Sequence, residues 1–235
     1  MFLLLFIICS LSFIEYTMSQ IKFKVSTSMI ISGASKSGKT VWVYNLLKQV
    51  PYLFEVPFDR ILYAYSIWQP TFDRILETCN NIQFHEGLPT EETLNKFIHD
   101  QEYKHILIII DDLMHTSLNS RTVELLYTQS CHHLNISVIN IQQNIFQQGK
   151  NARSISLNAT VLVLFKNKRD GSQIMNLAKQ IAPRQTRGFM DIYNDAVSRQ
   201  YGYLIIDCEP SHDDLYKFRT NIFKEEEPII IYELL

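Results

Sequence analysis

The sequence lacks an excess of charge of one sign. Its 235 residues include 22 Lys and Arg against 24 Asp and Glu, a formal net charge of -2 at pH 7. A chain so close to neutrality has no overall basic field that would attract nucleic acid. Any contact with DNA must come from local loops or from a pore formed by several subunits, so a simple nucleic-acid-binding protein is disfavoured.

Cysteines are few, and their spacing does not suit a metal site. The four are Cys9, Cys79, Cys131 and Cys208, with no CxxC or CxxH pattern among them. This spacing argues against both a disulfide framework and a zinc site. Scattered thiols are typical of proteins in a reducing compartment.

The sequence has no apolar run long enough for a comfortable membrane span. Residues 1–14, MFLLLFIICSLSFI, are apolar but shorter than the ~20 residues that a span requires. They lack the basic start and the small-residue cleavage site of a secretory signal. Met18 offers a second start, just before a strand-like segment. We therefore favour a hydrophobic leader, residues 1–17, that is not part of the native protein, with an anchor or a secretory signal as alternatives.

Strand-like and helix-like segments alternate along the rest of the chain, with no repeat and no long linker. The strand-like runs are Val25–Ser32, Ile61–Ile67, His105–Asp111, Ile136–Ile141, Thr160–Phe165 and Tyr201–Asp207. Apolar runs separated by amphipathic helices are typical of strands buried on both faces. We predict an α/β fold with a mostly parallel central sheet flanked by helices, over residues 18–222. Residues 223–235 form a tail that contains KEEEPIIIYELL. We expect this tail to add an edge strand, with a docking peptide as the alternative.

A glycine loop between a predicted strand and a predicted helix indicates a phosphate site. GASKSGKT matches the P-loop pattern GxxxxGK[ST] in full. Glycines let backbone N–H groups converge on phosphates at a helix N-terminus, which already favours anions. Lys39 would reach the β- and γ-phosphates, and the Thr40 hydroxyl would bind Mg²⁺. The expected nucleotide-binding residues are Gly33, Ala34, Ser35, Lys36, Ser37, Gly38, Lys39 and Thr40.

An apolar strand ending in two carboxylates supplies the second half of the predicted site. In LIIIDD, Leu107–Asp112, the strand end would deliver the carboxylates to the phosphate crevice. We expect Asp111 to hold Mg²⁺ and Asp112 to polarise the attacking water as a base. Acidic pairs after strands also occur as helix N-caps, but the phosphate loop earlier in the chain favours catalysis. The two motifs together predict a P-loop ATPase that uses ATP and Mg²⁺.

Gln143 is the third candidate catalytic residue. It follows the strand ISVINI, and in P-loop ATPases with an additional strand between the two Walker strands a polar residue there senses the γ-phosphate. A glutamine amide can both accept and donate hydrogen bonds, as orienting a water requires. The alternative is an ordinary polar strand end entering a loop.

With these elements in order, the chain resembles the FtsK/HerA superfamily. More narrowly, it resembles the genome-packaging ATPases of double-stranded DNA viruses and of the virus-like Maverick/Polinton transposons and adintoviruses. The resemblance extends from about Thr27 to Ile222, and its middle block is the most specific. The segments that carry it are GASKSGKT, LIIIDDLM, CHHLNISVINIQQNIF, ARSISLNATVLVLFKNKRD, QIMNLAKQIAP, YGYLIID and FRTNIF.

The resemblance implies a homo-oligomeric ring with each nucleotide at a subunit boundary. Hydrolysis would drive double-stranded DNA, whatever its sequence, into a preformed capsid, with a capsid or portal protein as partner. It further implies an intracellular protein, in the host nucleus or cytoplasm or associated with the virion, without stable membrane association.

The resemblance also implies that a neighbour's arginine neutralises charge in the transition state. Arg153 is our first candidate and Arg169 our second, although each has an ordinary solvated role as its alternative. Candidate DNA contacts are basic residues in two loops, and solvated loops are again the alternative. These residues are Lys166, Lys168, Arg169, Arg184 and Arg187.

Two departures from the family pattern keep other functions open. Asp112 stands where many members have Glu, which would suit a nucleotide-binding scaffold that does not hydrolyse. FKNKRD, Phe165–Asp170, contains NKxD, a guanine-specificity signature that would suit a GTPase-like switch. However, DDLM lacks the glycine that GTPases place after the Walker B aspartate, so we interpret NKxD as a chance match of a short motif.

Overall fold

The structure is a computed structural model. It describes residues 3–5, 21–100, 103–113, 120–130, 135–146, 151–169, 171–226 and 228–234. Most of the expected leader, with Met18, lies outside the described residues, as do Cys9, Cys131 and Asp170.

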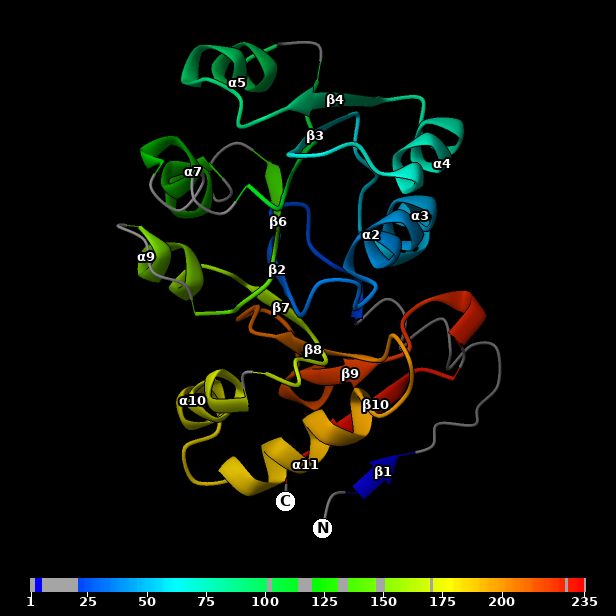
Figure 1. Ribbon diagram of the computed structural model, residues 1–235, viewed down its shortest axis with the longest axis vertical. Helices are drawn as coiled ribbons and strands as arrows, with labels where there is room; N and C mark the ends of the chain where they lie inside the picture. Colours follow the sequence, from blue (N-terminus) through cyan, green and yellow to red (C-terminus); the bar gives the residue numbers. More distant parts are fainter. Residues whose placement is uncertain are drawn as a thin grey trace.

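A sheet of ten strands, formed by the described residues, lies at the centre of the molecule (Figure 1). The strand order is β1-β10-β9-β8-β7-β2-β6-β5-β3-β4. Strands from β7 to β4 in that order pair in parallel. They are β7 (Val161–Phe165), β2 (Ser28–Ser32), β6 (Ile136–Gln142), β5 (Ile106–Asp111), β3 (Arg60–Tyr65) and β4 (Ile82–Glu86). Antiparallel pairs extend the sheet beyond β7, through β8 (Tyr203–Asp207), β9 (Phe218–Thr220), β10 (Ile230–Glu233) and β1 (Leu3–Leu5).

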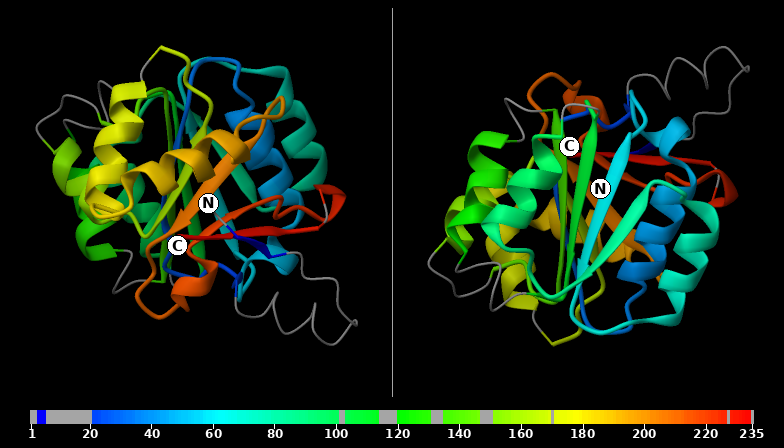
Figure 2. Two further views of the ribbon diagram at one scale, coloured as in Figure 1. Left: turned by 90° about the horizontal axis from the view of Figure 1, so that it is seen from below. Right: turned by 90° about the horizontal axis from the view of Figure 1, so that it is seen from above.

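Helices cover both faces of this sheet, as the perpendicular views in Figure 2 show. One face carries α2 (Lys39–Lys48), α3 (Val50–Leu53) and α4 (Pro70–Thr78). The other carries α5 (Glu91–Ile98), α7 (Arg121–Leu125), α9 (Ala152–Leu157), α10 (Gly171–Ile181) and α11 (Thr186–Ala196). Short η segments complete the described elements: η1 (Leu126–Ser130), η2 (Asp214–Tyr216) and η3 (Lys224–Glu226). None of the helices in the described part of the chain has the length and apolar character needed to cross a bilayer.

Alternate residues of the central strands pack into two separate cores. In β5, Ile108 and Ile110 join the core under α5, α7, α9, α10 and α11. Leu107 and Ile109 of the same strand join the core under α2, α3 and α4. Because side chains alternate between the two faces of a strand, a strand covered on both faces is apolar at nearly every position. This requirement explains the nearly continuous apolar runs of the sequence.

The fold class predicted from the sequence is confirmed. β6 lies between β2 and β5, which is the additional-strand arrangement. The edge-strand expectation for the tail needs a correction, because β10 pairs with β9 on one side and with Leu3–Leu5 on the other. β1, from the apolar N-terminal run, therefore occupies that edge of the sheet. The predicted run Tyr201–Asp207 also begins later than expected, since β8 starts at Tyr203.

Candidate active site

A cleft of about 930 Å³ opens at the edge of the sheet where the parallel strands end. It is lined by most of the glycine loop, the ends of β5 and β6, and residues 199–203. In open α/β sheets, ligands bind at this edge, outside the carboxyl ends of the strands. The position of the cleft therefore agrees with the site that the sequence predicts.

The two glycines of the loop each meet a constraint that only glycine satisfies easily. A Cβ on Gly33 would lie 2.5 Å from the Cβ of Phe165 on β7. Gly38, directly before α2, has a φ of 104°, a left-handed conformation that side chains disfavour. The loop is further fixed because the Gly33 amide donates to the Gln142 carbonyl at 3.3 Å. The conformation of the loop is thus fixed by its contacts with neighbouring strands as well as by its own glycines.

Lys39 lies across the glycine loop. Its Nζ donates to the carbonyl oxygens of Gly33 at 2.7 Å and Ala34 at 2.9 Å. Burial lowers the pKa of Lys39, and the charges of Asp111 and Asp112 partly oppose that shift. The lysine charge and the two carboxylates therefore act on each other within one cleft.

Asp111 is the most buried carboxylate of the cleft, 4% exposed at the end of β5. It accepts a hydrogen bond from the Tyr63 hydroxyl at 2.8 Å and a longer one from Thr40 Oγ1 at 3.5 Å. Burial raises the pKa of Asp111 to about 6, with a further rise from the charge of Asp112; Tyr63, Lys39 and Thr40 lower it. A cation bound beside this carboxylate would stabilise its charged form.

Asp112 and Gln143 meet beside Asp111. Gln143 Nε2 donates to Asp112 Oδ1 at 3.3 Å, and both residues line the cleft. Asp112 has a φ of 54° and is exposed, so the chain turns out of β5 at this residue. The candidate base and the candidate sensor therefore form a hydrogen-bonded pair at the mouth of the cleft.

The donors in the cleft suit Mg²⁺ bound together with a nucleotide. Thr40 and Asp111 offer hard oxygen ligands, which Mg²⁺ prefers, and it commonly takes only one or two from the protein. The described residues contain no cluster of three or more His, Cys, Asp or Glu that could hold a metal alone. The expected metal ligands Thr40 and Asp111 thus fit the ion.

The predicted arginines lie elsewhere. Arg153 on α9 and Arg169 before α10 are both exposed, and neither lines the cleft of its own chain. Arg199 is the arginine that lines the cleft among the residues that the structure describes. Lys166 and Lys168 are also exposed. The role of Arg153 or Arg169 in a neighbouring subunit therefore stays a prediction.

Sequence reasoning missed two tyrosines of the site. Tyr63 reaches Asp111 because β3 pairs with β5, with Tyr65 opposite Asp111, and a buried tyrosine hydroxyl needs a partner. Tyr201 reaches the cleft because β8 runs antiparallel to β7, which brings its first residues to the edge where β7 ends. A parallel β8 would have put Tyr201 at the opposite edge. A tyrosine within an apolar run was the only signal available for Tyr63.

A family model described as "Poxvirus A32 protein" matches residues 14–217 of the chain. A search of curated protein sequences finds no match. The solved structure of the genome packaging NTPase B204 from Sulfolobus turreted icosahedral virus 2, in complex with ATP-gammaS, matches with a TM-score of 0.55 and 13% identity, covering 90% of this chain and 98% of that chain. EssC (ATPases 2 and 3) from Geobacillus thermodenitrificans matches with a TM-score of 0.45 and 14% identity, covering 65% of this chain and 34% of that chain. The similarity to B204 supports the fold described above.

Proposed function

This chain belongs to the poxvirus A32 protein family, and from that membership and the geometry of the cleft we propose that it is an ATP-hydrolysing motor that translocates double-stranded DNA into a viral or virus-like capsid. The observation that carries the proposal is the meeting of Thr40, on the glycine loop, with Asp111, at the end of β5, at 3.5 Å. The similarity to B204, which carries an ATP analogue and is described as a genome packaging NTPase, supports the same reading.

The residues at the phosphate end of the cleft each have a role in hydrolysis. The glycine-loop amides and Lys39 bind the β- and γ-phosphates, while Thr40 and Asp111 would hold Mg²⁺. When bound, that ion would supply positive charge that offsets the negative charge of the phosphates. Asp112 accepts a proton from the attacking water or orients it. Gln143 donates to one oxygen of Asp112 and so leaves the other oxygen for the water.

The motor works as a homo-oligomeric ring. Because Arg153 and Arg169 lie outside the cleft of their own chain, either would complete the cleft of the next subunit and stabilise the transition-state charge. The basic loops of residues 166–169 and 184–187 would contact phosphates of the duplex. Such contacts read no sequence, which suits a motor that passes any DNA. The partner is a capsid or portal protein, and the site of action is intracellular.

A triplex-displacement assay tests the proposal, because only a protein that moves along the duplex strips off a third strand. We expect ATP-dependent displacement by the wild-type protein and none by Asp112→Asn, which retains the fold and the phosphate loop. A Lys96→Ala variant, changed on the exposed surface of α5, serves as the control and should displace normally. Displacement that does not require ATP hydrolysis would refute the motor.

Competition between ATP and GTP separates the motor from a GTPase-like switch. Asp170, the last residue of the NKxD match, lies outside the described residues. We expect ATP to compete at least as well as GTP for the purified protein. A clear preference for GTP would favour the switch and end the ATPase reading.

A further inference from the structure

The cleft extends beyond the residues assigned above to phosphate binding and hydrolysis. Asp111, Asp112 and Gln143 mark the end where the γ-phosphate would lie. Val41 and Asn45, further along α2, line the cleft as well. A second wall, made by residues 199–202 and Asn221, stands against the loop. Hydrolysis assigns no role to this wall.

Tyr201 is held over the glycine loop by a tight turn. The turn is closed by the Gly202 amide, which donates to the Arg199 carbonyl at 3.1 Å. A Cβ on Gly202 would lie 2.5 Å from the Ala196 carbonyl oxygen, so only glycine fits there. Tyr201 itself has a φ of 62°, a conformation uncommon for a bulky residue. Its ring lies beside Gly38, where an added Cβ would be 3.1 Å from Tyr201 Cδ1.

The ring of Tyr201 is nevertheless largely open to the cleft. The residue is 61% exposed, and Val41 on α2 is 45% exposed. Large exposed apolar surface that lines a concave site is typical of ligand contact. Aromatic faces of this kind stack readily on nucleobases. Tyr201 and Val41 thus offer the flat apolar surface that a purine ring requires.

Three amide side chains add hydrogen-bonding groups to the same end of the cleft. Asn45, Gln200 and Asn221 line it, and no hydrogen bond joins their side chains to a described residue. Each amide carries two donors and one acceptor. Adenine presents both kinds of partner, an exocyclic amino group and ring nitrogen acceptors. The three amides could therefore form hydrogen bonds with the edge of an adenine base whose face stacks on the Tyr201 ring.

We propose that the turn of residues 199–202, together with Asn221, forms the nucleobase subsite of the cleft, with Tyr201 stacked on adenine and the neighbouring amides bonded to its edge. The inference rests on the proposed function in one respect, that the cleft binds a nucleoside triphosphate. The direction of the loop supports it, since a nucleotide with its γ-phosphate at Asp111 extends its base away from that carboxylate. Tyr201 is then a specificity-determining residue, not a catalytic one.

The other role open to Tyr201 is to support Gly38 and the shape of the phosphate loop. The two roles differ in what they predict for a ligand without a base. A supporting residue affects every ligand that the loop holds, whereas a base-binding residue affects only nucleotides. Inorganic tripolyphosphate keeps the phosphates and lacks the base and ribose, so it separates them.

Isothermal titration of the full chain with the Mg²⁺ complexes of ATP and of tripolyphosphate tests the subsite. We expect Tyr201→Ala to weaken ATP binding about tenfold, the usual scale of one lost base–aromatic stack, and to leave tripolyphosphate affinity within about twofold. Leu157→Ala, at an exposed position on α9, is the control. Unchanged ATP affinity, or an equal loss for both ligands, would overturn the proposal.

Asn221→Gly tests the amide contacts separately. Asn221 has a φ of 57°, which glycine adopts without strain, so the variant removes the amide and keeps the turn. We expect weaker ATP binding with unchanged tripolyphosphate affinity; no change for ATP would remove Asn221 from the subsite. Both experiments measure the affinity for ATP or tripolyphosphate, so their outcome does not depend on whether the protein translocates DNA. Failure of the subsite proposal can therefore be told apart from failure of the proposed motor.

Discussion

Asp111 shows how one buried carboxylate depends on the residues around it. At 4% exposure, it pays a large desolvation cost when charged. Tyr63 Oη lies 2.8 Å from Asp111 Oδ2 and favours the charged form, the form that binds a cation. Tyr63 is itself fully buried, and burial together with the charge of Asp111 raises its pKa well above the ordinary value. It therefore stays a neutral donor.

Tyr63→Phe removes this hydrogen bond and little else. We expect the Mg²⁺ concentration needed for half-maximal ATP turnover to rise about tenfold, as for other residues that orient a metal ligand. Tyr127→Phe is the matched control, because it removes a buried tyrosine hydroxyl that donates to the Met29 carbonyl, away from the cleft. An unchanged Mg²⁺ requirement in Tyr63→Phe would mean that Asp111 does not need this donor.

Gly38→Ala tests the shape of the phosphate loop. The added Cβ would meet Tyr201 at 3.1 Å at a backbone φ of 104°, so the loop must distort. We expect ATP affinity to fall at least about tenfold, since each helix-terminal amide of the loop contributes to binding only when correctly placed. Gly171→Ala, with nothing within 4 Å of the added Cβ, is the control and should bind ATP normally.

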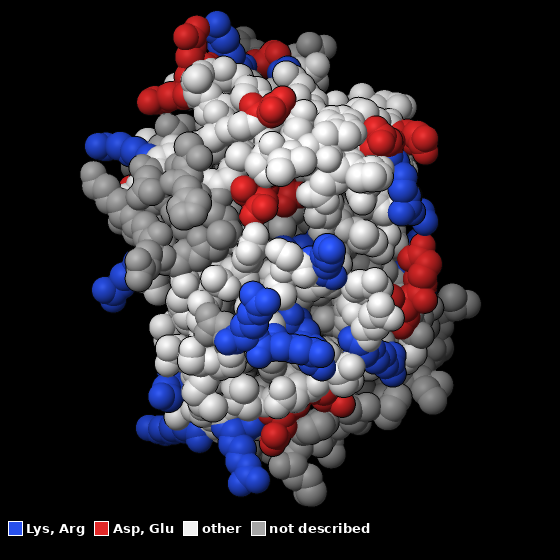
Figure 3. Space-filling view, in the orientation of Figure 1, with Lys and Arg blue, Asp and Glu red and all other residues white. Residues whose placement is uncertain are grey.

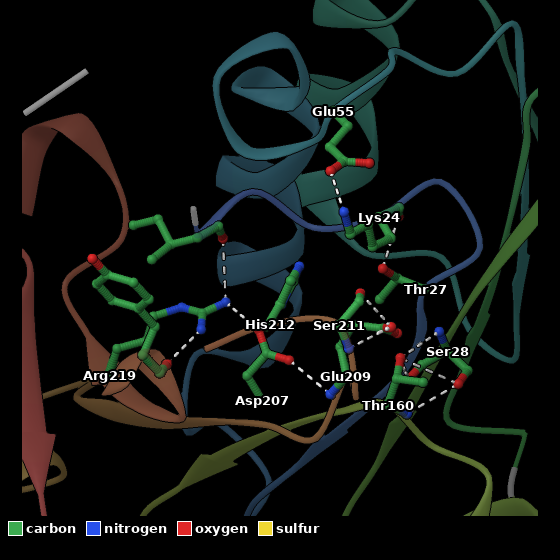
Figure 4. A network of polar contacts seen from close by, with 12 residues as sticks. Lys24, Thr27, Ser28, Glu55, Thr160, Asp207, Glu209, Ser211, His212 and Arg219 are labelled. Atoms are coloured by element: carbon green, nitrogen blue, oxygen red, sulfur yellow. Dashed lines mark hydrogen bonds and ion pairs between the residues drawn. The ribbon is translucent and has the colours of Figure 1, made fainter. Parts of the chain in front are cut away.

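At the scale of elements, the end of β8 is joined to β9 by a buried charge network (Figure 4). Arg219 on β9 is 0% exposed and donates to Asp207 Oδ2 at 2.8 Å and to the Tyr216 carbonyl at 2.7 Å. His212 Nδ1 lies 2.9 Å from the same carboxylate oxygen. Arg219 also donates to the Ile21 carbonyl at 3.3 Å. The network therefore ties the antiparallel strands to the segment that leads into β2.

Asp207→Asn leaves the Arg219 charge buried without its partner. Removing one member of a buried pair commonly costs about 3 kcal/mol of unfolding free energy, and we expect a loss of that order in urea unfolding. Lys48→Ala, which breaks an exposed pair with Glu225, should cost far less. Equal stability of Asp207→Asn and the wild type would show that the network does not hold the strands.

The same pair gives a pH dependence of stability. Burial raises the pKa of Asp207, but the His212 hydrogen bond and the Arg219 charge outweigh it and hold the pKa below its ordinary value of 3.8. The folded protein thus keeps this carboxylate charged to a lower pH than the unfolded chain does. Its contribution is present above pH 3.8 and is lost as the pH falls through the folded-state pKa. Urea unfolding should show a steeper loss of stability as the pH falls below about 4 in the wild type than in Asp207→Asn.

Elements with strong local signals were predictable from the sequence. β5 is apolar up to its terminal Asp111 and β7 is apolar throughout, and the phosphate loop has a full motif. The existence of these elements and their meeting at one edge therefore followed directly. β4 was not predicted, because it is only partly buried and its sequence, IQFHE, lacks an apolar run. β9 was not predicted because it has only three residues. The antiparallel direction of β8, and with it the position of Tyr201, depends on tertiary pairing that no local pattern encodes. The catalytic roles of Asp112, Gln143 and Arg153 stay predictions.

At the scale of the whole molecule, charge is distributed unevenly although the net charge is small. Residues 166–199 contain seven Lys and Arg against three Asp and no Glu. In Figure 3, Lys and Arg atoms gather in the lower half of the face, over the part of the molecule that contains β8, β9 and α11, whereas most acidic atoms lie in the upper half and at the right edge. This half would present a basic surface to DNA despite the near-neutral total.

Replacing Arg184 and Arg187 with alanine tests that surface. If both contact phosphates, DNA affinity should fall and the slope of log affinity against log salt should decrease by about 2, roughly one per lost contact. The effect should be the same for duplexes of different sequence. Lys96→Ala combined with Lys104→Ala, in the other half of the molecule, is the control. An unchanged salt slope would exclude these two arginines from the DNA path.

The most direct test of the central claim is steady-state ATP turnover, measured with and without duplex DNA, in the wild type and in Asp112→Asn. A DNA-packaging ATPase should show Mg²⁺-dependent turnover that duplex DNA stimulates. The variant should still bind ATP but turn it over at least about 100-fold more slowly, as the loss of a general base entails. Wild-type protein that binds ATP without hydrolysing it, with DNA present or absent, would contradict the proposed motor and leave a nucleotide-binding scaffold in its place.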